Sequence, residues 1–212
     1  MATIKTLKAA AITGDVVASS RMHSMRRKKL QRKIDQFNEQ FLKQYPDLKL
    51  QQYRGDSLQA ILTKNRMQSL SMALQLQCFL LTEEFKIRLS IGLGEISFQS
   101  KDVITSDGTA FQVSGPLIDE LKKRNELIGI TATDANFAAE WQVHSASLNF
   151  LLERLSAAQA EALYLHLQNA KQEDIAKALK ISQPSVHQRL QAAGAEVFIS
   201  IIKRFESTVA LL

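Results

Sequence analysis

The N-terminal part of the chain alternates between short apolar runs and amphipathic segments. Residues 8–18 are apolar and β-branched on either side of the polar Thr13-Gly14-Asp15, and this pattern predicts a buried strand with a polar exit. From Ser24 to the residue before Pro46, the spacing predicts an amphipathic helix. Its apolar positions recur every three or four residues, at Leu30, Ile34, Phe37 and Phe41.

The next segments complete a predicted sheet. Residues 49–53 and 58–62 flank the polar turn Arg54-Gly55-Asp56-Ser57 and predict a β-hairpin. The pattern then predicts a helix over 67–84, a strand over 86–98, a helix over 107–123 and a strand over 127–132. The order β-α-β-β-α-β-α-β predicts an α+β fold of ferredoxin-like or palm type, with helices on one face of an antiparallel sheet.

The C-terminal part is predicted to be all-helical. A helix over 134–152 is expected to pack on the sheet domain and lead to three short helices over 158–167, 172–179 and 183–193. With the boundary near 154–157, the chain divides into an α+β domain at 1–153 and an all-α domain at 154–212. Ser182 is the expected N-cap of the last short helix, with Pro184 in its first turn.

The short helices carry the pattern of a helix-turn-helix. Residues 174–182 read Asp-Ile-Ala-Lys-Ala-Leu-Lys-Ile-Ser, with Val186 and Leu190 following, and resemble the motif of sigma-factor region 4 and of response-regulator output domains. The turn residue is Lys180, where such motifs often have glycine, and a left-handed lysine costs about 1 kcal/mol. The resemblance implies that the helix at 183–193 is a recognition helix for double-stranded DNA.

The residues expected to contact DNA can donate to phosphates or to base edges. They are Ser182, Gln183, Ser185, His187, Gln188, Arg189 and Gln191. The alternative is a three-helix domain that packs on its neighbour or dimerises without touching DNA. If the chain dimerises, the amphipathic tail at 197–212 is the expected interface, although its apolar stripe could instead pack within the chain against Leu163 and Leu167.

The composition indicates the class of protein and its location. Hydrophobic residues make up 45% and charged residues 23% of the chain, the profile of a globular protein without a membrane span or signal peptide, so we expect a cytoplasmic location. Cys78, the single cysteine, is interpreted as a small residue that fills the core.

The net charge is +6, and the positive charge is concentrated near the N-terminal end of the first predicted helix. The segment from Arg21 to Lys33 contains seven basic residues and no acidic residue. They predict a phosphate or nucleic-acid patch centred on Arg26, Arg27, Lys28 and Lys29, the alternative being a solvated helix face.

Two aspartates are candidate metal ligands. Asp15 ends the first strand and Asp56 sits at the tip of the hairpin, so this strand order brings them side by side. Paired carboxylates can hold the Mg²⁺ ions of phosphoryl chemistry. In the alternative, Asp56 is a turn residue that caps the backbone.

The strings around these aspartates resemble class III nucleotidyl cyclase domains and, more closely and over nearly the whole chain, the SatD family of bacterial proteins. They lie at residues 12–20, 53–56, 87–96 and 107–111. The resemblance implies metal ligation by Asp15 and Asp56. It also places Gln112 and Pro116 where the cyclases have their transition-state asparagine and arginine, so we expect no cyclase activity. Lys122, Lys123 and Arg124, further along the same predicted helix, are expected to lie too far away to replace the arginine.

Three hypotheses follow. In the first, the protein is a cytoplasmic DNA-binding regulator whose cyclase-like domain senses a ligand or mediates dimerisation. In the second, it is a metal-dependent enzyme or binding protein for nucleotides, acting through Asp15 and Asp56. In the third, both domains are interaction scaffolds.

Overall fold

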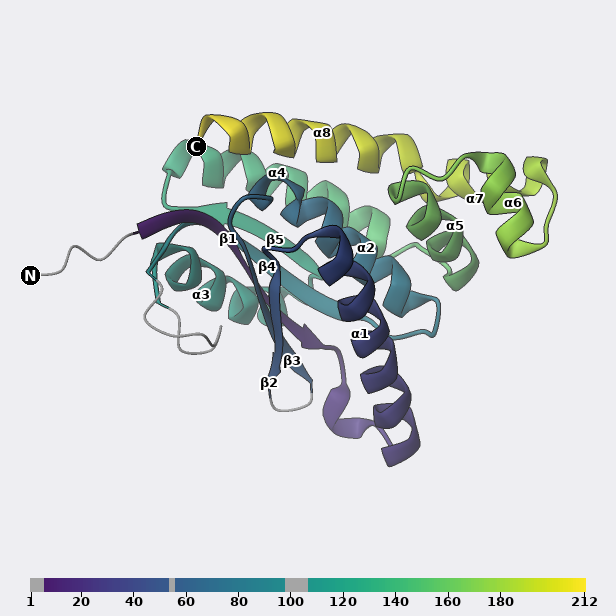
Figure 1. The fold of residues 1–212 in the computed structure, drawn as a ribbon, viewed down its shortest axis with the longest axis horizontal. Helices are drawn as coiled ribbons and strands as arrows, with labels where there is room; N and C mark the ends of the chain where they lie inside the picture. Colours follow the sequence, from purple (N-terminus) through teal and green to yellow (C-terminus); the bar gives the residue numbers. More distant parts are fainter. Residues whose placement is uncertain (1–5, 54–55, 98–106) are drawn as a thin grey trace, which may run out of the picture.

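The computed structural model describes residues 6–53, 56–97 and 107–212 (Figure 1). The predicted turn residues Arg54 and Gly55, and Phe98 at the end of a predicted strand, lie outside the described residues. Five strands form one sheet in the order β2-β3-β1-β4-β5. Their bounds are β1 Thr6–Val16, β2 Lys49–Tyr53, β3 Ser57–Leu62, β4 Ile87–Ser97 and β5 Ile128–Ala132.

The sheet is antiparallel except at one pair. Strand β1 pairs antiparallel with both β3 and β4, and β2 with β3, whereas β4 and β5 run parallel. The predicted α+β class with a largely antiparallel sheet is therefore confirmed, and the last pair is the exception to the predicted antiparallel order. The reason is the connection, because the segment between β4 and β5 contains a helix that returns the chain to the end of the sheet from which β4 began.

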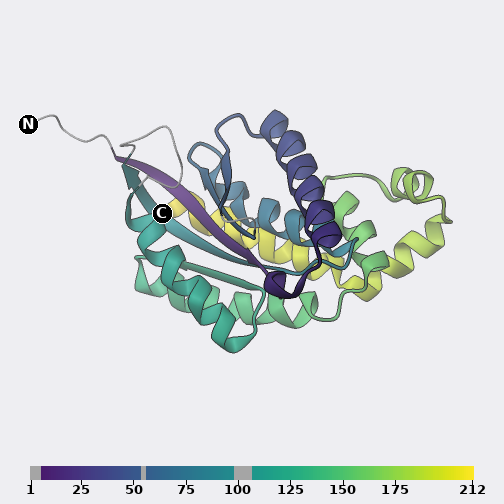
Figure 2. The same cartoon turned by 90° about the horizontal axis from the view of Figure 1, so that it is seen from below.

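Helices lie on both faces of the sheet, not on one as predicted. Figure 2 shows α1 and α3 on opposite sides of it. Alternate β4 residues such as Leu89 and Ile91 belong to the large apolar cluster that α1, α2 and α4 share, while Gly92 and Gly94 face α3. The helices here are α1 Ser24–Gln44, α2 Ser69–Leu81, α3 Thr109–Arg124 and α4 Ala135–Leu152, with the 3₁₀ turns η1 Ser19–Arg21 and η2 Arg66–Gln68.

The glycines of β4 allow α3 to lie close to the sheet. A Cβ placed on Gly92 would stand 2.3 Å from the carbonyl oxygen of Ala110, and one on Gly94 would stand 2.5 Å from Oγ1 of Thr109. Both atoms belong to the first turn of α3, which thus rests directly on the strand. Glycine at these positions is explained by the close approach of two backbones.

The outer edge of β5 is covered by side chains of α4. Asn149 Oδ1 accepts from the N–H groups of Leu127 and Ile128, at 2.6 and 3.0 Å, and its Nδ2 donates to the Ile128 carbonyl at 2.8 Å. Ser145 Oγ accepts from the Ile130 N–H at 3.2 Å. Helix α4 therefore satisfies edge groups that an uncovered strand would offer to another chain.

The C-terminal helices are α5 Ala157–Leu167, α6 Gln172–Leu179, α7 Gln183–Ala193 and α8 Ala195–Leu211. Helices α5, α6 and α7 gather at one end of the molecule, and α8 runs back along α4 (Figure 1). The apolar stripe of α8 is buried there, with the Phe205 ring in edge contact with Trp141 at a centroid distance of 5.0 Å. Of the two expectations for this stripe, packing within the chain is found in place of a dimer interface, and α8 docks on α4, α2 and η2.

The apolar core is continuous from β1 to α8. Helices α2 and α5 pack together, and the Tyr164 hydroxyl donates to Gln40 Oε1 at 2.9 Å, which links α5 to α1. The division at 153/154 stays a prediction. Cys78 is buried in this core, as predicted, and burial raises the pKa of its thiol to about 12. Within the described residues, no helix combines the length and the apolar character that a membrane span requires.

Candidate functional sites

Asp15 and Asp56 are neighbours at one end of the sheet, as the strand order predicts. Asp15 is the register partner of Arg88 in β4 and of Ser57 in β3. The Val16 N–H donates to the Asp56 carbonyl at 2.9 Å, which holds the hairpin tip against the end of β1. The two carboxylates are close enough for the charge of Asp56 to raise the pKa of Asp15.

The two carboxylate oxygens of Asp15 have different surroundings. Oδ2 lies 3.7 Å from Arg88 Nη1 and 3.7 Å from Lys122 Nζ. Oδ1 is buried and accepts no hydrogen bond from the described residues. Burial raises the pKa of Asp15 above its ordinary value of 3.8, although the charges of Lys122 and Arg88 oppose this rise. Asp15 is therefore a carboxylate with one oxygen paired to cations and one that is buried without a hydrogen bond from the described residues.

Asp56 is held by the segment that follows β1. Its Oδ2 accepts from the Ser19 hydroxyl at 2.6 Å, and Ser57 Oγ lies 3.5 Å from its Oδ1. This arrangement resembles the turn aspartate that stabilises its own loop, which was the alternative interpretation of this residue. The contact with Ser19 also fixes η1 beside the hairpin tip.

Lys122 and Arg88 are the residues that sequence reasoning missed. Lys122 was considered only as a substitute for the cyclase arginine, and its contact with Asp15 was not predicted. Helix α3 starts beside Gly94 and runs along β4 towards Arg88, so its last turns reach the end of β1 where Asp15 lies. Gln112 is ten positions before Lys122, about 15 Å along a helix. Both Gln112 and Pro116 are exposed.

The aspartate pair fits Mg²⁺ only in part. Hard carboxylate oxygens are suitable ligands, and Asp15 Oδ1 has no partner among the described residues. Those residues contain no group of three His, Cys, Asp or Glu side chains able to hold a metal ion. Arg88 and Lys122 also compete for Oδ2. Two carboxylates can hold Mg²⁺ when phosphate oxygens and water complete its coordination, as Mg²⁺ commonly requires.

A cavity of about 280 Å³ opens beside Asp56. It combines apolar side chains (Met22 and Leu30) with the Asp56 carboxylate and two cations. Its lining residues are Ser19, Ser20, Met22, Arg27, Lys28, Leu30, Gln31 and Asp56. The cavity thus places groups that suit an apolar ring and groups that suit a phosphate next to the aspartate pair.

The basic cluster of α1 is partly engaged within the chain. Arg26 donates to the Glu84 carbonyl at 3.2 Å, and Arg27 to the Met22 carbonyl at 3.1 Å. Lys29 pairs with the Glu83 carboxylate. Lys28 lines the cavity beside Asp56. Of the four residues predicted as a phosphate patch, three therefore also tie α1 to its surroundings.

Helix α7 and the turn before it have the predicted local geometry. Lys180 has φ 54°, the left-handed conformation expected at the turn, and Ser182 caps α7 by accepting from the Ser185 N–H at 3.3 Å. Val186 and Leu190 are buried against the neighbouring helices. The predicted contact residues that are exposed are Ser182, Gln183, His187, Gln188 and Gln191.

Arg189 and Ser185 are only half-exposed and have other contacts. Arg189 Nη1 lies 3.4 Å from the Ala158 carbonyl and 3.6 Å from a Glu161 carboxylate oxygen, both in α5. Ser185 Oγ lies 2.8 Å from Ser182 Oγ. Arg189 therefore fastens α7 to α5, and the outward face of α7 is formed by glutamines and a histidine.

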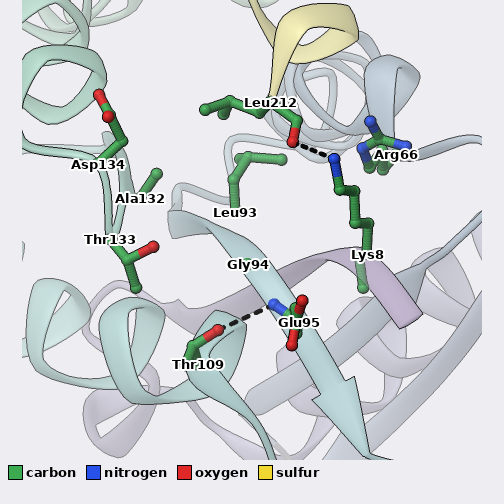
Figure 3. A pocket seen from close by; sticks show the side chains of 11 residues that line it. Lys8, Arg66, Leu93, Gly94, Glu95, Thr109, Ala132, Thr133, Asp134 and Leu212 are labelled. Atoms are coloured by element: carbon green, nitrogen blue, oxygen red, sulfur yellow. Dashed lines mark hydrogen bonds between the residues drawn. The ribbon is translucent and has the colours of Figure 1, made fainter. Parts of the chain in front are cut away.

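Another cavity, of about 300 Å³, lies where β1, β4 and the end of α8 meet (Figure 3). Its charged residues are Lys8, Arg66, Glu95 and Asp134. Lys8 donates to the Leu212 carbonyl, and Arg66 to the Val209 carbonyl at 3.3 Å. These two cations serve the docking of α8.

Comparison with known proteins gives one family and a set of distant structures. The model of the SatD family matches residues 9–208. A bacterial light-regulated adenylyl cyclase is 12% identical over 59% of this chain and 43% of its own length, with a TM-score of 0.45. The adenylyl cyclase CyaB from P. aeruginosa is 13% identical over 59% of this chain and 77% of its own, with a TM-score of 0.42. A search of curated protein sequences finds no match.

Proposed function

This chain belongs to the SatD family, and we propose that it binds duplex DNA through the exposed face of α7. The observation that carries the proposal is the row Gln183, His187 and Gln191, spaced four residues apart on one side of a capped helix and exposed together. Amide and imidazole groups can donate to and accept from base edges. An α-helix with its side chains is about 10–12 Å across, which fits a major groove about 12 Å wide.

The support for α7 is rigid. Ser182 caps its N-terminus, Val186 and Leu190 anchor its inner side, and Arg189 ties it to α5. A helix held on three sides presents its outer side chains in a fixed arrangement, which favours specific contacts over loose ones. The exposed Lys171, Lys177 and Lys180 of the neighbouring helix and turn supply positive charge for the DNA backbone.

The test is a fluorescence-anisotropy titration of the full chain with labelled duplex DNA over a range of salt. We expect binding that weakens steeply with salt. The double variant Gln183→Ala/Gln191→Ala should weaken specific binding by at least tenfold, since a base contact is worth about 1–3 kcal/mol. The matched control, Gln112→Ala/Gln142→Ala, removes two exposed glutamines elsewhere. Absence of binding at low salt, or equal weakening by the control, would exclude this function.

The second candidate function is Mg²⁺-dependent binding of a nucleotide beside Asp15 and Asp56. The buried Oδ1 of Asp15, which has no partner among the described residues, and the mixed cavity next to Asp56 favour it. In this function the two carboxylates would hold the metal, which would neutralise phosphate charge, and Arg27 and Lys28 would bind phosphate oxygens directly.

Thermal unfolding with and without MgCl₂ and a nucleoside triphosphate tests this second function. Each variant is compared with its own ligand-free form, so that changes in basal stability cancel. We expect a ligand-dependent rise in Tm for the wild type that is lost in Asp15→Asn and kept in Asp174→Asn, an exposed aspartate on α6. An equal rise in Asp15→Asn would rule out a role for this pair.

A further inference from the structure

A second basic cavity, separate from the aspartate pair, lies at the start of α1. Its volume is about 350 Å³. Two segments far apart in sequence build it, the one that links β1 to α1 and the one that links α2 to β4. The lining residues are Val17, Ala18, Arg21, Met22, His23, Arg26, Glu84 and Lys86. Three permanent cations and a histidine thus face one carboxylate among the described lining residues.

The two segments are held together by backbone contacts. The Val17 N–H donates to the Lys86 carbonyl at 2.9 Å, which continues the β1–β4 ladder beyond the end of β1. Ala18 and Glu84 both have left-handed backbones, with φ of 57° and 58°, and turn the chain sharply on either side of this contact. The cavity walls are therefore fixed by the sheet and its turns.

Arg26 is positioned at the cavity by two interactions. Its Nη2 donates to the Glu84 carbonyl at 3.2 Å, and its guanidinium stands 4.9 Å from the centre of the Phe85 ring. A guanidinium has five N–H donors, and only one donor atom is used in this hydrogen bond. The remaining donors are available to a ligand in the cavity.

The start of α1 adds to the positive potential. His23 is the N-cap residue and gives no side-chain hydrogen bond to the first turn within the described structure. The first turn of this 21-residue helix carries no acidic residue. The positive end of the helix dipole is thus left without a counter-charge on its own helix, beside Arg21 and Arg26.

We propose that this cavity binds a small ligand through a diphosphate group. Arg21, Arg26 and Lys86 supply the charge, and an anion between them would relieve their mutual repulsion. The volume lies at the lower end of the range for small-molecule sites, which suits pyrophosphate or the diphosphate of a nucleotide. Both sources share the same chemistry. This site is independent of α7 and of the carboxylates Asp15 and Asp56.

Isothermal titration calorimetry of the full chain with pyrophosphate and with ADP, both in EDTA, tests the proposal. EDTA removes metal-dependent binding at the aspartate pair, so that only metal-independent binding is measured. We expect Arg21→Gln/Lys86→Gln to weaken binding at least tenfold. The matched control, Lys123→Gln/Lys203→Gln, removes two exposed cations elsewhere and should leave binding unchanged.

The two affinities distinguish pyrophosphate from a nucleotide as the source of the diphosphate group. Equal affinity for pyrophosphate and ADP supports recognition of the diphosphate alone, and tighter binding of ADP supports a nucleotide. The proposal is overturned if neither ligand binds, or if the control weakens binding as much as the cavity variant. It is also overturned if Arg21→Gln/Lys86→Gln weakens only the binding of duplex DNA, since these cations would then contact the DNA backbone.

Discussion

Lys122 Nζ, in the last turn of α3, lies 3.7 Å from Asp15 Oδ2, in the central strand β1. The contact joins the crossover helix to the carboxylate at the end of the sheet. Arg88 approaches the same oxygen at the same distance. Asp15 is thus shared between two cations while its other oxygen is buried without a partner among the described residues.

Replacement of Lys122 should raise the pKa of Asp15 further. Burial already raises this pKa, and the charge of Lys122 is the largest opposing effect. In Lys122→Met that attraction is lost, so the carboxyl should hold its proton to a higher pH. An NMR titration of the Asp15 side-chain carbon measures the change. Lys123→Met, at the exposed neighbouring position, is the control, and an identical Asp15 titration in both variants would refute the effect.

Asp15 should also make stability depend on pH in a defined direction. Its folded pKa is above the ordinary value of 3.8, so the folded state binds its proton more tightly than the unfolded state. The stabilisation is then complete below pH 3.8 and is lost as the pH rises through the folded pKa. Relative to Asp15→Asn, the wild type should lose free energy of unfolding over that window. Urea unfolding at a series of pH values measures the difference, and a constant difference would contradict it.

Asn149→Leu should destabilise the protein by about 2–4 kcal/mol. The substitution removes the hydrogen bonds of the buried Asn149 side chain to two N–H groups and one carbonyl at the β5 edge, and leucine cannot replace them. Urea denaturation gives the free energy of unfolding. Asn136→Leu, at an exposed position on the same helix, should change it by less than about 0.5 kcal/mol. Similar losses in both variants would mean that the edge contacts contribute little.

Two glycines should respond in opposite directions to alanine. Gly92→Ala forces a methyl group against the α3 backbone and should cost about 1–3 kcal/mol. At Gly115, inside α3, no described atom lies within 4 Å of an added Cβ, so Gly115→Ala should stabilise by about 0.5–1 kcal/mol. Thermal unfolding of the two variants and the wild type measures both changes in stability. A stable Gly92→Ala would show that the sheet and α3 can separate without cost.

Phe205→Ala should loosen α8 and expose Trp141. The Phe205 side chain is fully buried, and its loss leaves a cavity that costs about 3–5 kcal/mol. Trp141 is the single tryptophan, so a red shift of its fluorescence reports water at this contact. Val197→Ala, at a half-exposed site on the same helix, should leave the spectrum unchanged.

The sequence pattern predicted local structure better than long-range packing. The cap at Ser182 and the left-handed Lys180 follow from neighbouring residues, and both are found. The adjacency of Asp15 and Asp56 follows from the strand order. The cap and the turn depend on short stretches of chain, where residue type and spacing carry most of the information. The adjacency depends on the pairing of β1 with β3, which the order of the predicted elements implied.

The errors concern contacts between distant segments. Periodicity showed that Phe205 is buried but not that Trp141 covers it, because an apolar stripe fits any apolar surface of similar shape. In the same way, the pattern of α3 gave a helix but not its direction along β4, so the contact of Lys122 with Asp15 was missed. The hydrogen bonds of Asn149 to β5 likewise depend on how α4 docks, which its sequence alone does not state.

The docking of α8 has a consequence for the order of folding during synthesis. Lys8 in β1 donates to the Leu212 carbonyl, and the two residues are 204 positions apart in the chain. The contact of Trp141 with Phe205 joins residues that are closer in sequence but still distant. Contacts of such long range form late, since most of the chain must be present before they can close. We therefore expect the apolar surface of α4 and α2 to stay uncovered on the ribosome until α8 has emerged, and in that interval this surface is open to aggregation and to chaperones.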